Sequence, residues 1–270
     1  MTGYLGTGSH QEMSDSPILV TKALTKEFKG FVAVSNVNLS VQRGHIHALI
    51  GPNGAGKTTC FNLLTKFLEP SSGQIVFNGV DITSENPAQI ARRGIIRSFQ
   101  ISAVFPQMTV LENVRIGLQR QLGTSYFFWR SDSSLHQLNP QAMALLAEVD
   151  LTDFANELAV NLPYGRKRAL EIATTLAMDP ELMLLDEPTQ GMGHEDVERV
   201  TQLIKKVSSG RTILMVEHNM NVIASIADKI TVLQRGAVLA EGTYSEVSKD
   251  PQVMQAYMGT ADAVLSGASA

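Results

Sequence analysis

The amino-acid sequence predicts an α/β protein built around a largely parallel sheet. Short apolar runs typical of strands alternate with segments of helical periodicity, and this alternation favours parallel strands joined by helices. One apolar run, residues 46–50, leads directly into a glycine-rich loop at residues 51–58. With 270 residues, of which 44% are hydrophobic, the chain can bury the core of one large domain or of a domain with a subdomain.

The apolar runs predicted to be strands span residues 18–24, 32–41, 46–50, 74–77, 95–99, 182–185, 212–216 and 229–233. Helices fill much of the space between them. Residues 197–207 carry Val, Leu and Ile at three- and four-residue spacing after an acidic first turn, and the pattern stops before Gly210. Asn139 and Pro140 are predicted to be the N-cap and the first residue of another helix.

The middle of the chain follows a different pattern. From Val110 to about Asn161 the strand pattern lapses, and short helical stretches flank an irregular polar and aromatic segment at residues 123–138. We interpret this region as a helical subdomain inserted into the α/β core. The aromatic cluster at residues 126–129 either docks a partner or packs inside the subdomain, and the sequence leaves both interpretations open.

Residues 51–58 fit the phosphate-binding pattern G-x-x-x-x-G-K-[ST]. Glycines keep side chains out of a tight loop, so consecutive backbone N–H groups can point at an anion, and the helix that begins near Lys57 adds the positive end of its dipole. Lys57 would reach the β- and γ-phosphates of a nucleotide, and the Thr58 hydroxyl would coordinate Mg²⁺. The alternative is a glycine-rich turn between a strand and a helix that binds no ligand.

Two carboxylates follow the buried run at residues 182–185. Because ligands of α/β sheets bind at the carboxyl ends of strands, we expect Asp186 to hold Mg²⁺ through its water shell and Glu187 to orient or deprotonate the attacking water. His218 follows the run at residues 212–216 and can hydrogen-bond phosphate and water together, although its position equally allows a structural histidine. Gln100 offers an uncharged amide to Mg²⁺ or to the attacking water.

Composition excludes several other classes of protein. The formal net charge of -4 provides no polybasic face for nucleic acid, and the single Cys60 provides no disulfide framework and suits a reducing compartment. No apolar run approaches the roughly 18 to 20 residues that cross a bilayer. Residues 1–16 and 259–270 are small and polar, and we expect a flexible leader and a flexible tail.

The phosphate loop belongs to a set of motifs that occur in a fixed order. They are the Walker A loop at residues 51–58, the Q-loop glutamine Gln100, a signature region at residues 162–166, the Walker B strand with Glu187, and the switch histidine His218. In this order they closely resemble one family, the nucleotide-binding subunits of ATP-binding cassette (ABC) transporters, from about Ile18 to Met258. The segments at residues 97–100, 108–114, 162–173 and 216–220 look most like the importer ATPases for branched-chain amino acids.

The resemblance implies a P-loop NTPase (RecA-like) core at residues 17–100 and 165–258, with an antiparallel β edge and an inserted α-helical subdomain at about residues 101–164. It implies ATP and Mg²⁺ as cofactors and a subunit that hydrolyses ATP to power uptake of a small solute, with branched-chain amino acids as the expected cargo. The implied nucleotide contacts are Phe28, which would stack on adenine, Gly51, Pro52, Asn53, Gly54, Ala55, Gly56, Lys57, Thr58, Thr59 and Gly165. The implied metal contacts are Thr58, Gln100 and Asp186.

The same resemblance implies a peripheral protein on the cytoplasmic face of the inner (plasma) membrane. Its partners would be transmembrane permease subunits, a second ATPase subunit that is identical or different, and, indirectly, a periplasmic or extracellular solute-binding protein. Two cassettes would close face to face, each trapping ATP between its own Walker A loop and the signature helix of the other.

Two positions depart from the family pattern. Pro163 replaces the serine of Leu-Ser-Gly-Gly-Gln, so one hydroxyl donor is lost while the helix dipole remains. Gly193 stands where the family often has aspartate. These departures leave open how well the chain completes a partner's site. The alternative functions are the ATPase of a lipid exporter, a soluble cassette ATPase that acts on ribosomes or DNA, and a module that binds ATP without hydrolysing it.

Overall fold

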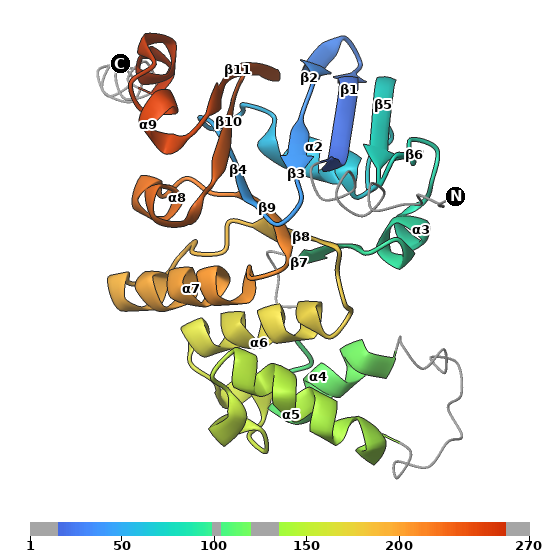
Figure 1. Ribbon diagram of the computed structural model, residues 1–270, viewed down its shortest axis with the longest axis vertical. Helices are drawn as coiled ribbons and strands as arrows, with labels where there is room; N and C mark the ends of the chain where they lie inside the picture. Colours follow the sequence, from blue (N-terminus) through green and yellow to red (C-terminus); the bar gives the residue numbers. More distant parts are fainter. Residues whose placement is uncertain (1–15, 99–103, 120–134, 258–270) are drawn as a thin grey trace, which may run out of the picture. The chain divides into compact units, whose positions relative to one another are not determined.

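The computed structural model describes residues 16–98, 104–119 and 135–257. The chain divides into two compact units, one made of residues up to 87 together with those from 227 onward, and the other of residues 88–226. Both units combine strands and helices (Figure 1), which confirms the predicted α/β class. In the described parts of the chain, no helix is both long enough and apolar enough to cross a membrane.

The first unit contains an antiparallel sheet with the strand order β2-β1-β5-β6, in which β3 also pairs with β1. Its strands are β1 (Pro17–Phe28), β2 (Phe31–Val37), β3 (Ser40–Gln42), β5 (Ser72–Phe77) and β6 (Val80–Asp81). The single strand predicted at residues 32–41 is wrong, because the chain is divided there into β2 and β3. Between them the Thr21 hydroxyl donates to the carbonyl of Val37, and the Asn38 side chain accepts from the N–H of Ala23, so side chains replace the ladder hydrogen bonds.

The first unit has three further strands, one of which, β4 (Ile46–Ile50), leads into the phosphate loop. Strand β10 (Lys229–Gln234) is parallel to β4 and antiparallel to β11 (Ala237–Gly242). The sequence did not predict strand β11. Every residue of β4 is buried. Helix α2 (Lys57–Leu64) follows the loop after β4, helix α9 (Tyr244–Val247) follows β11, and residues 251–257 are helical.

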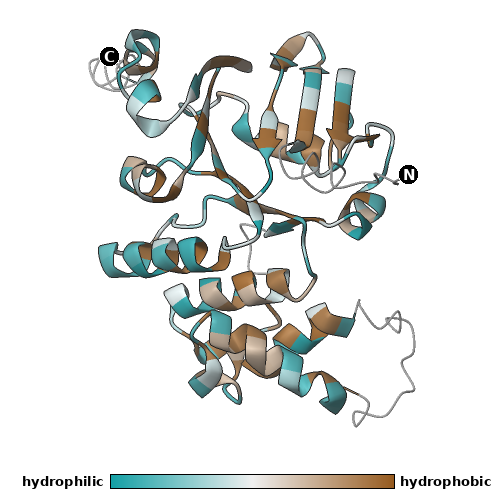
Figure 2. Ribbon diagram, in the orientation of Figure 1, coloured by the Kyte–Doolittle hydropathy of each residue, from teal (hydrophilic) through white to brown (hydrophobic). Residues whose placement is uncertain are grey.

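The second unit has three parallel strands in the order β7-β8-β9. These are β7 (Ile95–Ser98), β8 (Leu182–Asp186) and β9 (Thr212–Val216), and the last two are buried at every position. A strand covered on both faces reads as an unbroken apolar run, which is why the sequence located β8 and β9 closely. Figure 2 shows the hydrophobic residues concentrated along the strands.

The helices of the second unit are α3 (Pro87–Arg92), α4 (Val110–Gln119), α5 (Asn139–Glu148), α6 (Tyr164–Leu176), α7 (His194–Val207) and α8 (Met220–Ile226), with short 3-10 turns η3 (His136–Leu138), η4 (Thr152–Phe154) and η5 (Ala159–Asn161). Helix α6 packs against α4, α5 and α7 (Figure 1). The helix predicted over residues 197–207 is confirmed as α7.

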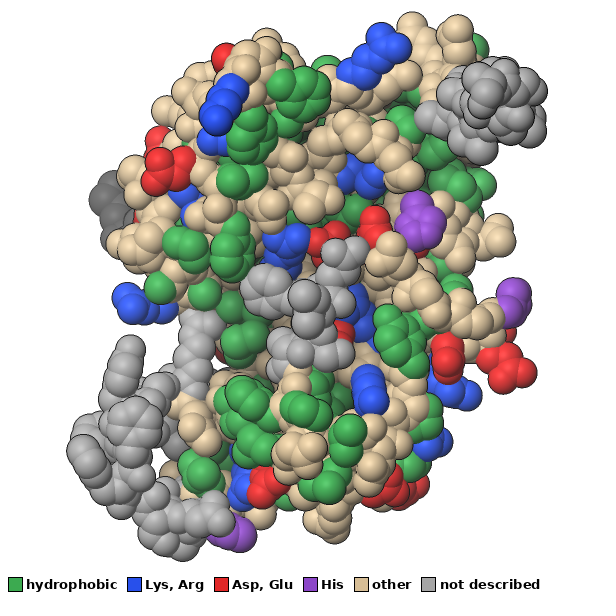
Figure 3. Space-filling model, turned by 180° about the vertical axis from the view of Figure 1, so that it is seen from behind, with side chains coloured by type: hydrophobic (Ala, Val, Ile, Leu, Met, Phe, Trp, Pro, Cys, Tyr) green, Lys and Arg blue, Asp and Glu red, His purple; other side chains and the backbone are tan. Residues whose placement is uncertain are grey.

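Several large apolar side chains of the second unit remain exposed. They are Phe105, Leu158, Val160 and Tyr164. The segments that carry the first three lie side by side, because the N–H groups of Ala159 and Val160 donate to the carbonyls of Met108 and Pro106. In Figure 3, hydrophobic side chains gather over the helices that lie in the lower part of Figure 1.

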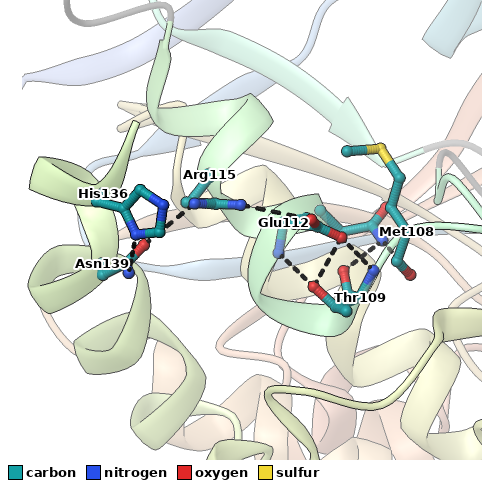
Figure 4. A network of polar contacts seen from close by, with 7 residues as sticks. Met108, Thr109, Glu112, Arg115, His136 and Asn139 are labelled. Carbon is teal, nitrogen blue, oxygen red and sulfur yellow. Dashed lines mark hydrogen bonds and ion pairs between the residues drawn. The ribbon is translucent and has the colours of Figure 1, made fainter. Parts of the chain in front are cut away.

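Helix α4 begins with a capping box that Figure 4 shows. Glu112 Oε2 accepts from the N–H of Thr109 at 2.7 Å, and the N–H of Glu112 donates to the Thr109 hydroxyl at 3.2 Å. Arg115 continues the network, with 3.6 Å between its Nη2 and Glu112 Oε1 and 3.4 Å between its Nη1 and Asn139 Oδ1. This network connects the start of α4 to the start of α5.

The predicted N-cap at Asn139 is wrong. Asn139 has helical dihedrals, and the 3-10 turn η3 runs directly into α5, so the cap position falls on Leu138. The side chain of Asn139 takes part in the network of Figure 4, where its Nδ2 lies 3.5 Å from Nδ1 of His136. Pro140 is therefore the second residue of the helix and not, as predicted, the first, although it still lies in the first turn, which tolerates proline.

Replacing Thr109 by Ala should lower the free energy of unfolding by about 1 kcal/mol, because the alanine side chain can neither accept from the N–H of Glu112 nor donate to its carboxylate, while the backbone N–H of residue 109 remains. Hydrogen bonds from the backbone N–H and from the hydroxyl of Thr109 lower the pKa of Glu112 below its ordinary 4.5. The contribution of the hydroxyl-to-carboxylate bond is therefore present above pH 4.5 and is lost as the pH falls through the lowered pKa. Urea unfolding of both proteins at pH 7 and at acid pH measures the difference. A difference in unfolding free energy between the two proteins that became larger at acid pH would contradict the proposed bond between Thr109 and the Glu112 carboxylate.

Candidate functional site

The loop between β4 and α2 takes a backbone course that only glycine adopts readily. Gly51, Gly54 and Gly56 have φ values of 150°, 79° and 100°. A Cβ atom on Gly51 would lie 2.2 Å from the carbonyl oxygen of Leu233, and one on Gly56 would lie 2.6 Å from the carbonyl oxygen of Ala33. At Gly54 a Cβ atom would meet nothing within 4 Å. Packing therefore requires two of the glycines, and backbone conformation favours all three.

This loop presents the start of α2 as an anion site. Gly56 is the N-cap residue, no side chain caps the helix, and the first turn has no acidic residue. Backbone N–H groups and the positive end of the helix dipole are therefore available to an anion. Lys57 is buried, and its Nζ donates to the carbonyls of Gly51 at 2.7 Å and Pro52 at 3.1 Å, so its charge lies inside the loop.

The neighbouring predicted contacts differ in exposure. Asn53 and Thr58 are exposed, Pro52 and Thr59 are partly exposed, and Ala55 is buried. Phe28 is 41% exposed at the end of β1, with Lys26 Nζ 5.1 Å from its ring centroid. Opposite it in the antiparallel ladder lies Phe31, which is also exposed and which the sequence analysis did not single out.

The C-terminal helical segment adds a feature that sequence reasoning missed. A cavity of about 510 Å³ is lined by residues 52–55 of the loop, 234 and 235 after β10, and 255 and 256 of that segment. Burial raises the pKa of Tyr257 to about 12, and the backbone of Gly51 partly offsets this rise. Tyr257 is therefore a half-buried neighbour of the phosphate loop.

In the second unit, the predicted carboxylates follow the buried strand β8. Asp186 is buried and pairs with the guanidinium of Arg97 on β7. Glu187 comes next and has a φ of 44°, a left-handed conformation that costs a residue with a side chain free energy. Its N–H donates to the carbonyl of Val216 at the end of β9, with an N to O distance of 2.9 Å.

His218 lies two residues beyond β9, beside the end of β8 because Asp186 pairs with Val216. Its side chain is 57% exposed, and its Nδ1 lies 3.9 Å from Oε1 of Glu217, which is fully buried. The same carboxylate oxygen accepts from the backbone N–H groups of His218 and Asn219. Glu217 thus orders the turn that carries the histidine, a role that the sequence analysis did not anticipate.

The predicted signature helix is α6, which begins at Tyr164 after the N-cap residue Pro163. No side chain caps this helix either. Gly165 is buried, and a Cβ atom there would lie 2.5 Å from Oδ1 of Asp196 in α7. Gly193, the second departure from the family pattern, is the N-cap residue of α7.

The structure thus groups the predicted residues in two sets, Phe28 with residues 51–59 in the first unit and Asp186, Glu187, His218 and Gly165 in the second. Gln100 and the aromatic cluster at residues 126–129 lie outside the described residues. His47 is structural, as its buried ring contacts the Thr231 hydroxyl at 2.8 Å and burial lowers its pKa to about 4.

Comparison with known proteins decides the family. Residues 34–190 match the family model described as ABC transporter. The chain belongs to the ABC transporter family. A second model, described as branched-chain amino acid ATP-binding cassette transporter, matches residues 237–263. The chain is therefore the ATP-binding and ATP-hydrolysing subunit of a transporter.

Similar proteins cover this cassette almost from end to end. It is 40% identical to the high-affinity branched-chain amino acid transport ATP-binding protein BraF of Pseudomonas aeruginosa, over 91% of this chain and 99% of BraF. Identity to LivG of Escherichia coli, which carries the same description, is 38% with the same coverage.

Solved structures give the same fold. The ADP conformation of an ATP-binding cassette of an ABC transporter superposes with a TM-score of 0.79 and 29% identity, over 90% of this chain and 99% of that one. A dimeric cassette in a post-hydrolysis state bound to ADP and Pi has a TM-score of 0.69 and 27% identity, over 84% of this chain and 98% of that one.

The packing of the loop predicts unequal effects of two glycine substitutions in this cassette. Gly56→Ala should lower the free energy of unfolding by about 3 kcal/mol, because it adds both a left-handed strain and a clash with a backbone oxygen. Gly44→Ala should cost only about 1 kcal/mol, because its φ is also positive but no atom lies within 4 Å. Denaturant unfolding measures both, and equal losses would show that the clash at Gly56 is relieved without cost.

Proposed function

We propose that this cassette hydrolyses ATP with Mg²⁺ to power the import of branched-chain amino acids. Branched-chain amino acids are proposed as the cargo because the chain is similar to BraF almost from end to end. The match of its C-terminal residues to the family model of branched-chain amino acid transporters supports the same cargo. No feature of the nucleotide site itself selects a cargo, so the cargo assignment needs its own experiment.

The residues of the first unit suit the binding of a triphosphate. The β- and γ-phosphates would receive the N–H groups of residues 54–59 and the ammonium of Lys57, which would exchange the carbonyls of Gly51 and Pro52 for phosphate oxygens. Phe28 has an exposed ring for stacking on the adenine. Phe31, exposed across the ladder, would border the same base.

The donors available for Mg²⁺ are hard oxygen atoms, which fit the preference of that ion. The exposed Thr58 hydroxyl and the Asp186 carboxylate are candidates in the described residues, and Gln100 is the third. Because Arg97 contacts Oδ2 of Asp186, this carboxylate would act through metal-bound water rather than as a chelating pair. Bound Mg²⁺ would neutralise charge that develops on the phosphate oxygens.

Glu187 would orient the attacking water and accept its proton, because it is the carboxylate that directly follows the carboxyl end of β8. The side chain of His218 is exposed, and the Glu217 carboxylate holds its turn by accepting from the backbone N–H of His218. His218 would hydrogen-bond the γ-phosphate. Gly165 and the N–H groups at the start of α6 would face the nucleotide of a second cassette, with Pro163 contributing no hydroxyl.

The partners follow from the same proposal. Two cassettes would close around ATP, and loss of phosphate would remove the contacts that favour the closed dimer. Permease subunits would contact the helical subdomain at about residues 101–164, and the exposed apolar side chains at Phe105, Leu158 and Val160 supply an interface of suitable character. A solute-binding protein outside the membrane would deliver the cargo, and the cassette would lie at the cytoplasmic face of the inner membrane.

Replacing Glu187 by Gln should lower kcat for ATP hydrolysis by about 100-fold or more while leaving ATP affinity unchanged. The two side chains have the same shape, so the strained backbone at this position should persist. Phosphate release and fluorescent-nucleotide titration provide the measurements. Turnover at the normal rate in this variant would remove Glu187 from its proposed role.

Replacing Lys57 by Ala should weaken ATP binding by at least about tenfold, because a charge-assisted hydrogen bond to phosphate is lost. Equilibrium titration measures the affinity, and the melting temperature shows whether the loop survives without its internal lysine contacts. Unchanged affinity in a folded variant would contradict the phosphate-loop assignment.

Reconstitution with candidate permease and solute-binding subunits in proteoliposomes tests the cargo. The expected result is ATP-dependent uptake of radiolabelled leucine, isoleucine or valine, with Glu187→Gln as the inactive control. ATP hydrolysis without uptake of any of the three would reject the proposed cargo and leave the ATPase assignment standing.

A further inference from the structure

Four charged side chains of the second unit are buried next to the end of β8. The side chains of Arg97, Asp186, Arg168 and Glu171 are 9%, 4%, 8% and 8% exposed. They come from β7, β8 and α6, so one cluster joins the Walker B strand to the signature helix and to the strand that precedes Gln100.

Each arginine holds a different part of Asp186. Arg97 pairs with the side-chain carboxylate. Arg168 donates through Nη1 to Oε2 of Glu171 at 2.5 Å and through Nη2 to the backbone carbonyl of Asp186 at 3.3 Å. Glu171 sits one turn further along α6, so it neutralises Arg168 and orients its planar guanidinium toward β8.

The carbonyl that Arg168 contacts belongs to the peptide group between Asp186 and Glu187. The N–H of the same peptide group donates to the carbonyl of Val216 at 2.9 Å. The peptide plane is therefore held at both ends, by α6 on one side and by β9 on the other. The next bond of the backbone, from the nitrogen of this peptide group to the Cα of Glu187, has the φ of 44°. Such a left-handed conformation persists only where surrounding contacts hold the backbone in it.

We propose that Arg168 is a positioning residue for Glu187. It holds the peptide group between Asp186 and Glu187 from the signature helix, and thereby sets the direction in which the Glu187 carboxylate leaves the backbone. Because Arg168 is anchored on α6, a displacement of that helix moves the support of Glu187. This inference rests on the proposed catalytic role of Glu187.

The competing explanation is that Arg168 and Glu171 form an ion pair that matters only for stability. Substitution of Arg168 alone does not separate the two explanations, because it leaves Glu171 buried without its partner. A double replacement by apolar residues of similar length does separate them. Arg168→Met with Glu171→Met removes both charges, and such pairs are often as stable as the ion pair that they replace.

Arg211 supplies a matched control. It also bridges a carboxylate and a backbone carbonyl, since Nη2 lies 3.1 Å from Oε2 of Glu148 and Nη1 donates to the carbonyl of Val207 at 2.9 Å. These contacts lie outside the peptide group between Asp186 and Glu187. Arg211→Met should therefore leave kcat unchanged, whatever it does to stability.

The experiment compares wild type, Arg168→Met, the double variant and Arg211→Met by melting temperature, ATP affinity, kcat and amide hydrogen exchange of the peptide that contains Glu187. We expect the single variant to melt earlier and the double variant to recover most of that loss. In the double variant kcat should remain at least about tenfold low, because small displacements of a catalytic group have large effects on rate. Its ATP affinity should stay within about twofold of wild type, since the phosphate loop is intact.

Hydrogen exchange at Glu187 should be faster in the double variant than in wild type, because the peptide group has lost one of its two supports. A double variant with wild-type kcat and unchanged exchange would overturn the proposal and identify a purely structural pair. If wild type itself failed to hydrolyse ATP, the proposed function would fail, while the exchange rates at Glu187 would still test what Arg168 holds.

Discussion

The candidate site depends on one constraint, which is that the backbone must leave a buried strand through conformations that residues with side chains avoid. After β4 the chain turns through three glycines with positive φ, and two of them have no room for a side chain. After β8 it turns through Glu187, which has the same kind of φ and whose carboxylate is the proposed catalytic base. Glycine removes the strain at the first turn, whereas at the second turn surrounding hydrogen bonds must hold the backbone in its strained conformation.

The two turns therefore rely on different kinds of support. The phosphate loop is held by backbone packing against Ala33 and Leu233 and by the ammonium of Lys57. The turn at Glu187 is held by charged groups, Arg97 on the Asp186 carboxylate and Arg168 on its carbonyl. Buried ion pairs contribute little net stability compared with apolar packing, but their directional hydrogen bonds orient a peptide group, which apolar contacts do not.

Much of the fold could be predicted because buried strands have a strong signal. Strands β4, β8 and β9 are buried at every residue, and their unbroken apolar runs marked their positions. Strand β11 has no fully buried residue, and the sequence did not reveal it. Asn139 was misplaced because a 3-10 turn extends α5 toward the N-terminus. The capping box at Thr109 and Glu112 has the pattern [ST]-x-x-[DE], so a search for that pattern would have marked the start of α4.

The sequence by itself determined the phosphate loop, the order of the motifs and the identity of the candidate base, switch histidine and metal ligands, because these depend on residue types at short spacing. Only the tertiary structure decided that Arg97 and Arg168 meet Asp186, that Glu217 orders the turn at His218, and that Tyr257 lies beside the phosphate loop. These partners are separated from the motifs by between one and about two hundred residues. The contacts of Glu217 are local to its turn. The contacts of Arg97, Arg168 and Tyr257 join segments that are distant in the chain, and strand pairing and helix packing leave no fixed spacing between such segments.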